Sequence, residues 1–166
     1  MKMKKYLLSI QLVGFFLILF IVTGSASAES IIARHSGKCL DVYGASKADH
    51  TNIIQYQCTD GAQEQDFMFN SVGEGYHQII AKHSGKCLDV KGASTADKAD
   101  IIQYHCQLEH KEQHFKFVKL GNGYHQIVAR HSGKCLDVNG ASTENKTKII
   151  QFHCQDGHHE QHFMLK

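Results

Sequence analysis

HSGKCLDV, at residues 35–42, occurs again without change at residues 83–90 and 131–138. The copies are 48 residues apart, and the Ile-Ile-Gln and second cysteine that follow each copy keep the same offset. A fixed period of this length indicates one supersecondary unit that packs against copies of itself. A site built inside the unit is therefore expected in up to three versions, which favours multivalent binding over a single catalytic centre.

Residues 1–28 lie outside the repeats and have the layout of a secretory signal peptide. Three lysines precede an almost wholly apolar run over residues 6–22, and Ala26-Ser27-Ala28 fits a cleavage site. We expect cleavage before Glu29 and secretion of residues 29–166, a length that suits one domain with its own core. The alternative is an uncleaved anchor, because the apolar run approaches the ~20 residues that span a bilayer.

The mature chain is nearly neutral. Three of the 18 basic residues lie in the leader, whereas none of the 16 acidic residues does. Nucleic acids and anionic membranes bind concentrated basic surfaces. We therefore expect neither nucleic acid nor, after cleavage of the leader, a membrane as a partner.

Six cysteines, two in each repeat, fall in a chain directed to an oxidising compartment, which favours disulfides. Threefold symmetry allows the first cysteine of a repeat to pair with the second of the same, next or previous repeat. Pairing within each repeat is simplest and closes loops of about 20 residues, each worth roughly 3 kcal/mol in the loop-entropy picture. Zinc binding is disfavoured because the spacing is far from Cys-x-x-Cys. The pairs within repeats are Cys39–Cys58, Cys87–Cys106 and Cys135–Cys154.

Short alternating apolar runs separated by glycine-containing turns predict an all-β fold. In the second repeat we expect strands at residues 76–81, 87–90, 100–106 and 114–118, with a tight hairpin turn at 72–76. An open solenoid needs polar capping repeats, and three blades are few for a propeller. The end repeats are as apolar as the middle one, which favours a closed, barrel-like domain whose last strand meets its first.

Three linked motifs carry a resemblance to a known family: GKCLDV, an aromatic residue two positions before the second cysteine, and Gln-x-aromatic. Recurring three times in register, they resemble the ricin B-type lectins over residues 30–166. The resemblance implies a β-trefoil of three repeats (30–77, 78–125 and 126–166), with disulfides inside the repeats and one shallow sugar site in each. The family's Gln-x-Trp is here Gln-x-Phe, and we expect this phenylalanine to fill the core at the threefold axis.

Sugar recognition needs an aromatic surface for the C–H face and fixed acceptors for vicinal hydroxyls. In each repeat the candidates are the aspartate of CLDV, the aromatic before the second cysteine, and a Glu-Gln pair in which glutamate stands where the family usually has asparagine. Alternatively, the aspartate caps a turn, the glutamine bonds only backbone, and the aromatic is a wall residue. The candidates are Asp41, Tyr56, Glu64, Gln65, Asp89, Tyr104, Glu112, Gln113, Asp137, Phe152, Glu160 and Gln161.

These candidate sites are not equivalent. Phe152 lacks the hydroxyl of its two counterparts, and the second repeat lacks the Asp-Gly that follows the second cysteine elsewhere. We expect the first repeat to hold the best site. Weak individual sites would act through avidity on repeated glycans or a polysaccharide, galactose-like sugars included.

Thirteen histidines are a marked excess that repetition explains in part. A structural metal site and a pH-sensitive surface are hypotheses for them, but we expect no metal and no cofactor. Catalysis is disfavoured because three like environments do not separate the pKa values of an acid and a base. The alternative function is a protein-binding trefoil, an inhibitor or toxin-targeting subunit, and a separate enzyme or toxin subunit is left open as a partner.

Overall fold

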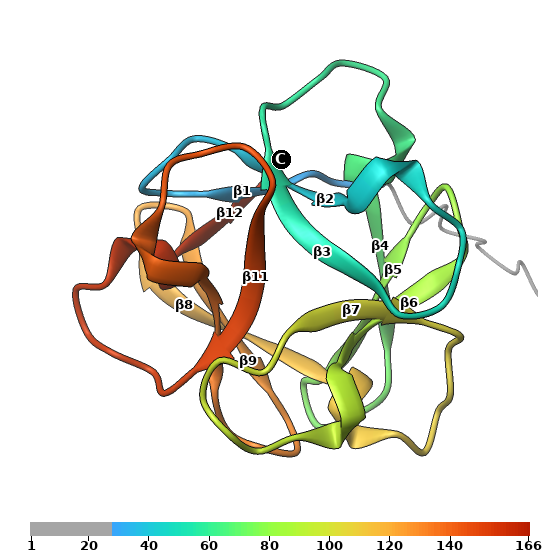
Figure 1. Cartoon of the computed structure of the whole chain (residues 1–166). Helices are drawn as coiled ribbons and strands as arrows, with labels where there is room; N and C mark the ends of the chain where they lie inside the picture. The colour runs from blue at the N-terminus through green and yellow to red at the C-terminus, as the bar shows by residue number, and fades with distance from the viewer. Residues whose placement is uncertain (1–27) are drawn as a thin grey trace, which may run out of the picture.

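The computed structural model describes residues 28–166, so the expected leader lies almost wholly outside the described residues. Each repeat contributes four short strands and two 3₁₀ turns (Figure 1). No helix within residues 28–166 is long and apolar enough to cross a membrane. The strands are β1 Ile31–Ala33, β2 Cys39–Val42, β3 Thr51–Tyr56, β4 Phe67–Ser71, β5 His77–Ala81, β6 Lys86–Val90, β7 Ile101–Tyr104, β8 Phe115–Gly121, β9 Tyr124–Ala129, β10 Cys135–Val138, β11 Thr147–Phe152 and β12 Phe163–Leu165.

The strands close on themselves. β1 pairs antiparallel with β12, with Ile31 opposite Leu165, so the last strand meets the first as expected. The hairpins β2–β3, β6–β7 and β10–β11 are one set of antiparallel pairs, and β3 pairs with both β7 and β11. Figure 1 shows β3, β7 and β11 around a pseudo-threefold axis. This closed arrangement is a β-trefoil, which confirms the predicted fold class.

The second repeat follows the predicted strand order, with small differences at the ends. The strand predicted at residues 100–106 is β7, which ends at Tyr104. Cys106 lies beyond the strand and forms the disulfide with Cys87. The turn before β5 is the expected hairpin: the Val72 N–H donates to the Tyr76 carbonyl at 3.0 Å. Gly73 in this turn has a φ of 86°, a left-handed conformation that glycine adopts at little cost.

The three Gln-x-Phe phenylalanines are fully buried, and they share one core cluster with the leucine and valine of each CLDV strand. Because side chains alternate along each strand, the same leucine, valine and phenylalanine positions of every repeat point into this cluster. All three disulfides lie within repeats, which confirms the β-trefoil with one disulfide in each repeat that the resemblance implies.

Neighbouring repeats are joined by a buried glutamine, the last residue of each Ile-Ile-Gln. Gln55 Nε2 donates to the carbonyls of Ser142 and Glu144 at 2.7 and 2.8 Å, and its Oε1 accepts from the Ser36 hydroxyl at 2.8 Å. Gln103 and Gln151 make the same set of bonds, each to the loop of the preceding repeat. Each loop is therefore fixed against the repeat beside it.

Candidate functional site

Three pockets, one in each repeat, occupy equivalent places on the trefoil. Their volumes are about 340 Å³ in the first repeat, 350 Å³ in the second and 210 Å³ in the third. In each, the CLDV aspartate, the aromatic residue and the glutamate line one pocket together. Of the three predicted glutamines, only Gln65 contributes to a pocket surface; Gln113 and Gln161 lie behind the wall.

Strand pairing brings the aspartate and the aromatic together. Asp41 on β2 lies opposite Ile54, and Tyr56 on β3 lies opposite Cys39. Asp41 and Tyr56 are therefore diagonal neighbours on one face of the hairpin, a separation that long side chains can bridge. Asp41 sits inside a strand rather than at a turn. The disulfide then fixes the far end of the Tyr56 strand.

The buried glutamine orients the aspartate. Gln65 Nε2 donates to Asp41 Oδ2 at 2.8 Å and to the Gln57 carbonyl at 3.1 Å, while its Oε1 accepts from the Thr59 N–H at 2.9 Å. The Gln113–Asp89 and Gln161–Asp137 bonds are both 2.9 Å. The side-chain amide of Gln65 is thus bonded to protein groups, and it contacts only Oδ2 of Asp41, not Oδ1.

Burial raises the pKa of Asp41, Asp89 and Asp137 above the usual carboxyl value. The glutamine bond opposes this effect, and the glutamate of the same repeat adds to it. A carboxylate that is partly desolvated and held by a donor is a strong, directed acceptor for hydroxyl groups.

The aromatic residue is half-buried in every repeat and lines the pocket there. Tyr104 and Phe152 each have a histidine ring beside them, with centroids 4.1 Å from His105 and 4.2 Å from His153. The first repeat has Gln57 at this position. The aromatic residue of the first site, Tyr56, therefore lacks the adjacent histidine ring that its counterparts have.

The glutamates also differ between repeats. His110 Nδ1 lies 2.7 Å from Glu112 Oε1, and His158 Nδ1 lies 2.8 Å from Glu160 Oε1. Partial burial acts to raise the pKa of Glu112 and of Glu160, but a backbone hydrogen bond and the histidine outweigh it, so both pKa values are lowered. Ala62 takes the place of the histidine in the first repeat and leaves Glu64 without such a partner.

Two kinds of lining residue are not among those predicted from the sequence. Tyr43, half exposed at 50%, gives the first pocket a second aromatic ring, where the other repeats have Lys91 and Asn139. An aromatic residue directly after CLDV in one repeat alone is a signal that the sequence does contain. The other kind comes from a different repeat, Lys146 in the first pocket being an example, and the motif spacing gives no hint of it.

Within residues 28–166, no three histidine, cysteine or acidic side chains are grouped so that they could hold a metal ion. The histidines instead make pairwise contacts. His35, His83 and His131 each place Nε2 2.9 Å from a serine carbonyl of another repeat.

A β-trefoil that repeats one shallow pocket three times defines a class of binding domain with several like sites. The sequence pattern of the ricin-type beta-trefoil lectin domain matches residues 27–163, and the chain belongs to that family. A comparison with curated proteins found no match.

Solved structures agree with this assignment. The designed threefold-symmetric protein ThreeFoil is 44% identical, with a TM-score of 0.80 over 83% of this chain and 96% of its own. An exo-beta-1,3-galactanase from Clostridium thermocellum is 35% identical, with a TM-score of 0.80 over 85% of this chain but only 30% of the enzyme. The C-half of an earthworm R-type lectin, solved with GalNAc, is 18% identical and shares the fold, with a TM-score of 0.68 over 84% of this chain and 98% of its own.

Proposed function

We propose that this protein is a secreted lectin that binds glycans or a polysaccharide through up to three shallow sites and has no catalytic activity of its own. The observation that carries the proposal is the threefold recurrence of one arrangement: an aspartate held by a buried glutamine beside a half-buried aromatic ring.

Each group has a defined task in this proposal. The aspartate and glutamate carboxylates accept hydrogen bonds from vicinal hydroxyls of the sugar. The aromatic ring packs against the apolar C–H face. The glutamine does not touch the sugar in the second and third sites but keeps the aspartate in position, which reduces the ordering cost of binding. The glutamate brings acceptors and no donors, unlike the family's asparagine.

The three sites give avidity rather than high affinity at any one of them. A glycan surface that engages two or three pockets at once makes the second contact effectively intramolecular, and this can raise overall binding by roughly 10²–10⁴-fold. Galactose-like sugars are the first to test, because the galactanase and the GalNAc complex among the similar structures point to them.

Secretion is part of the proposal. The leader-like residues 1–28 support it, and so do three disulfides, which persist in oxidising compartments. N-terminal sequencing of protein recovered from culture medium should begin at Glu29. Retention of the lysine-rich start in the recovered protein would contradict cleavage.

A glycan array probed with the oxidised protein tests the lectin proposal. The matched control carries alanine at positions 41, 89 and 137, and its circular dichroism spectrum should show the native fold. We expect the native protein to bind a defined set of glycans and the control to lose them. A folded native protein that binds none would remove the lectin proposal and favour a protein partner instead.

A further inference from the structure

Each pocket is completed by one residue from a neighbouring repeat, always at the same repeat position. Lys146 lines the first pocket, His50 the second and Lys98 the third. The three residues are spaced by the 48-residue period, yet each serves a site in a different copy of the unit. No site is therefore contained in a single repeat.

The backbone at this position is fixed. The buried glutamine of the host repeat bonds the loop, as Gln55 does to Ser142 and Glu144, and its carbonyl accepts the N–H of the lining residue: 2.8 Å from Lys146, 2.9 Å from His50 and 2.8 Å from Lys98. All three lining residues have a left-handed φ of 64° to 67°. A non-glycine residue held there is strained, and such strain often marks a functional position.

The chemistry of the lining residue complements the rest of the pocket. Ionised aspartate and glutamate accept hydrogen bonds but donate none. The family's asparagine, which would donate, is replaced by Glu64 and its counterparts. A lysine ammonium offers three donors and no acceptor. Neither Lys146 nor Lys98 forms a salt bridge with any carboxylate of the described residues, although several other lysines do. Both ammonium groups are thus available to a ligand.

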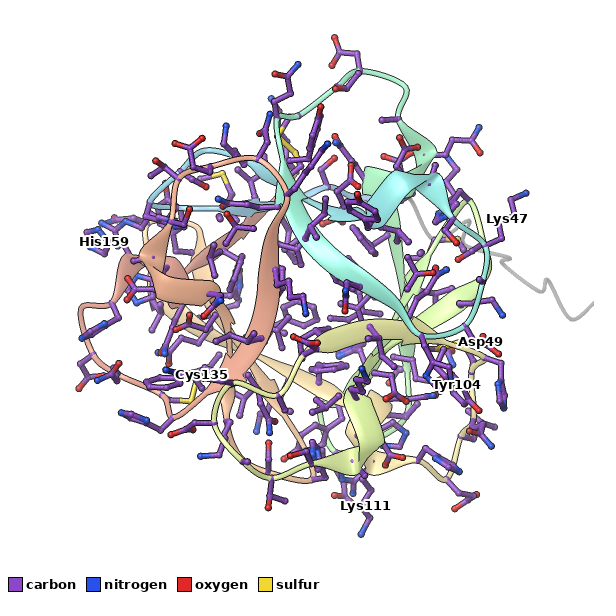
Figure 2. All side chains as sticks on the ribbon, in the orientation of Figure 1. Lys47, Asp49, Tyr104, Lys111, Cys135 and His159 are labelled. Atoms are coloured by element: carbon purple, nitrogen blue, oxygen red, sulfur yellow. A yellow bond between two sulfur atoms is a disulfide. The ribbon has the colours of Figure 1, made fainter. Side chains whose placement is uncertain are left out.

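The second site differs at this position. The His50 ring lies 4.8 Å from the Tyr104 ring, centroid to centroid, so the neighbouring loop packs on the aromatic residue itself. In Figure 2, Asp49 of this loop lies beside Tyr104 of the second repeat. Asp49 also bonds Lys86 and contacts His105, which holds the loop close to the second site.

We propose that the residue at this position, which each site takes from its neighbour, sets the difference between the sites: it is a sugar-binding donor in the first and third sites and a barrier in the second. Lys146 and Lys98 donate to an oxygen acceptor of the glycan, whereas His50 restricts access to Tyr104. This inference rests on the proposed lectin function. It assigns the first and third sites to glycans with an acceptor oxygen at that edge, with an acidic substituent gaining most because the hydrogen bond then becomes an ion pair.

The test uses proteins in which one site remains. Asp89→Asn with Asp137→Asn leaves the first site; asparagine can still accept from the glutamine while turning a donor toward the sugar. Lys146→Met, Lys146→Arg and the control Lys47→Met are then compared on an array of neutral and uronic-acid glycans. Lys47 is exposed, lies at the rim of the molecule in Figure 2 and lines none of the three pockets.

We expect Lys146→Met to weaken binding about tenfold, the loss of one charge-assisted hydrogen bond, with an unchanged melting temperature. Lys146→Arg should retain most of the binding, and Lys47→Met all of it. In the protein that keeps only the second site, His50→Lys should strengthen binding. Equal binding by Lys146→Met and Lys47→Met would overturn the inference while the lectin function stood; absence of binding by the native protein would instead remove the proposed function.

Discussion

Replacement of Gln65 by leucine tests the idea that a buried amide, rather than a sugar-contacting group, organises the site. The change removes three hydrogen bonds: to Asp41 Oδ2, to the Gln57 carbonyl and from the Thr59 N–H. Two neutral bonds at about 1 kcal/mol each and one to a carboxylate at about 2 kcal/mol give a loss near 4 kcal/mol. Leucine restores part of the apolar packing but leaves the carbonyl and N–H without their partner.

The same change alters the response to pH. Burial already raises the pKa of Asp41, and the glutamine bond restrains that rise. Without the bond, the folded-state pKa moves further above the unfolded value. A carboxyl with a raised folded pKa favours folding while protonated, and that contribution is lost as pH rises through the folded pKa. The Gln65→Leu protein should therefore lose more stability than the native protein between acid and neutral pH.

Urea unfolding of the oxidised protein at several pH values measures both effects. Gln63→Leu is the matched control, because Gln63 is an exposed glutamine in the same 3₁₀ turn. We expect the control to stay within about 0.5 kcal/mol of the native protein, as surface changes usually do. If Gln65→Leu cost as little as Gln63→Leu, with no added pH dependence, the role assigned to Gln65 would be wrong.

Three further predictions concern the core, an inter-repeat contact and the first site. Phe115→Ala should lower the free energy of unfolding by about 3–5 kcal/mol, because its side chain is fully buried; a loss below about 1 kcal/mol in urea unfolding would contradict its place in the core. Asp97 bonds Lys134 and His153, which lower the pKa of Asp97 to about 2. Its stabilisation is therefore present above the usual carboxyl pKa and lost as pH falls toward 2, so melting temperatures of native protein and Asp97→Asn should converge over that interval; a constant difference would rule this out. Tyr43→Ala should weaken first-site binding about tenfold in the protein that keeps only that site, through loss of one exposed ring, whereas unchanged titration isotherms would show that Tyr43 lies outside the contact.

The fold could be predicted from the sequence because its evidence is periodic and local. Identical CLDV strands at a fixed offset imply like units, and the alternation of apolar residues places Leu40 and Val42 on the core. Closure was predicted because the end repeats are as apolar as the middle one, and the pairing of β1 with β12 confirms it. The ends of strands were harder to predict. Residues up to Cys106 continue the alternating pattern, but β7 ends at Tyr104 and Cys106 lies beyond it in a disulfide.

The site could be predicted only in part. The aspartate, aromatic and glutamate of each repeat share a pocket as expected, because they lie on paired strands and the turn beside them. The orientation of Gln65 depends on which groups surround it after folding, and no spacing rule specifies that. Lys146 reaches the first pocket from the third repeat, so its contribution requires the closed trefoil to be known.

The most direct test of the central claim is a residue-resolved NMR titration of the oxidised protein with the glycan that binds best on the array. Shift changes at saturation locate even weak sites. The account predicts that they concentrate at Asp41, Tyr56 and Glu64 and at their counterparts in the other two repeats. Changes confined to the hairpin turns such as residues 72–76, with the pocket residues unmoved, would contradict it.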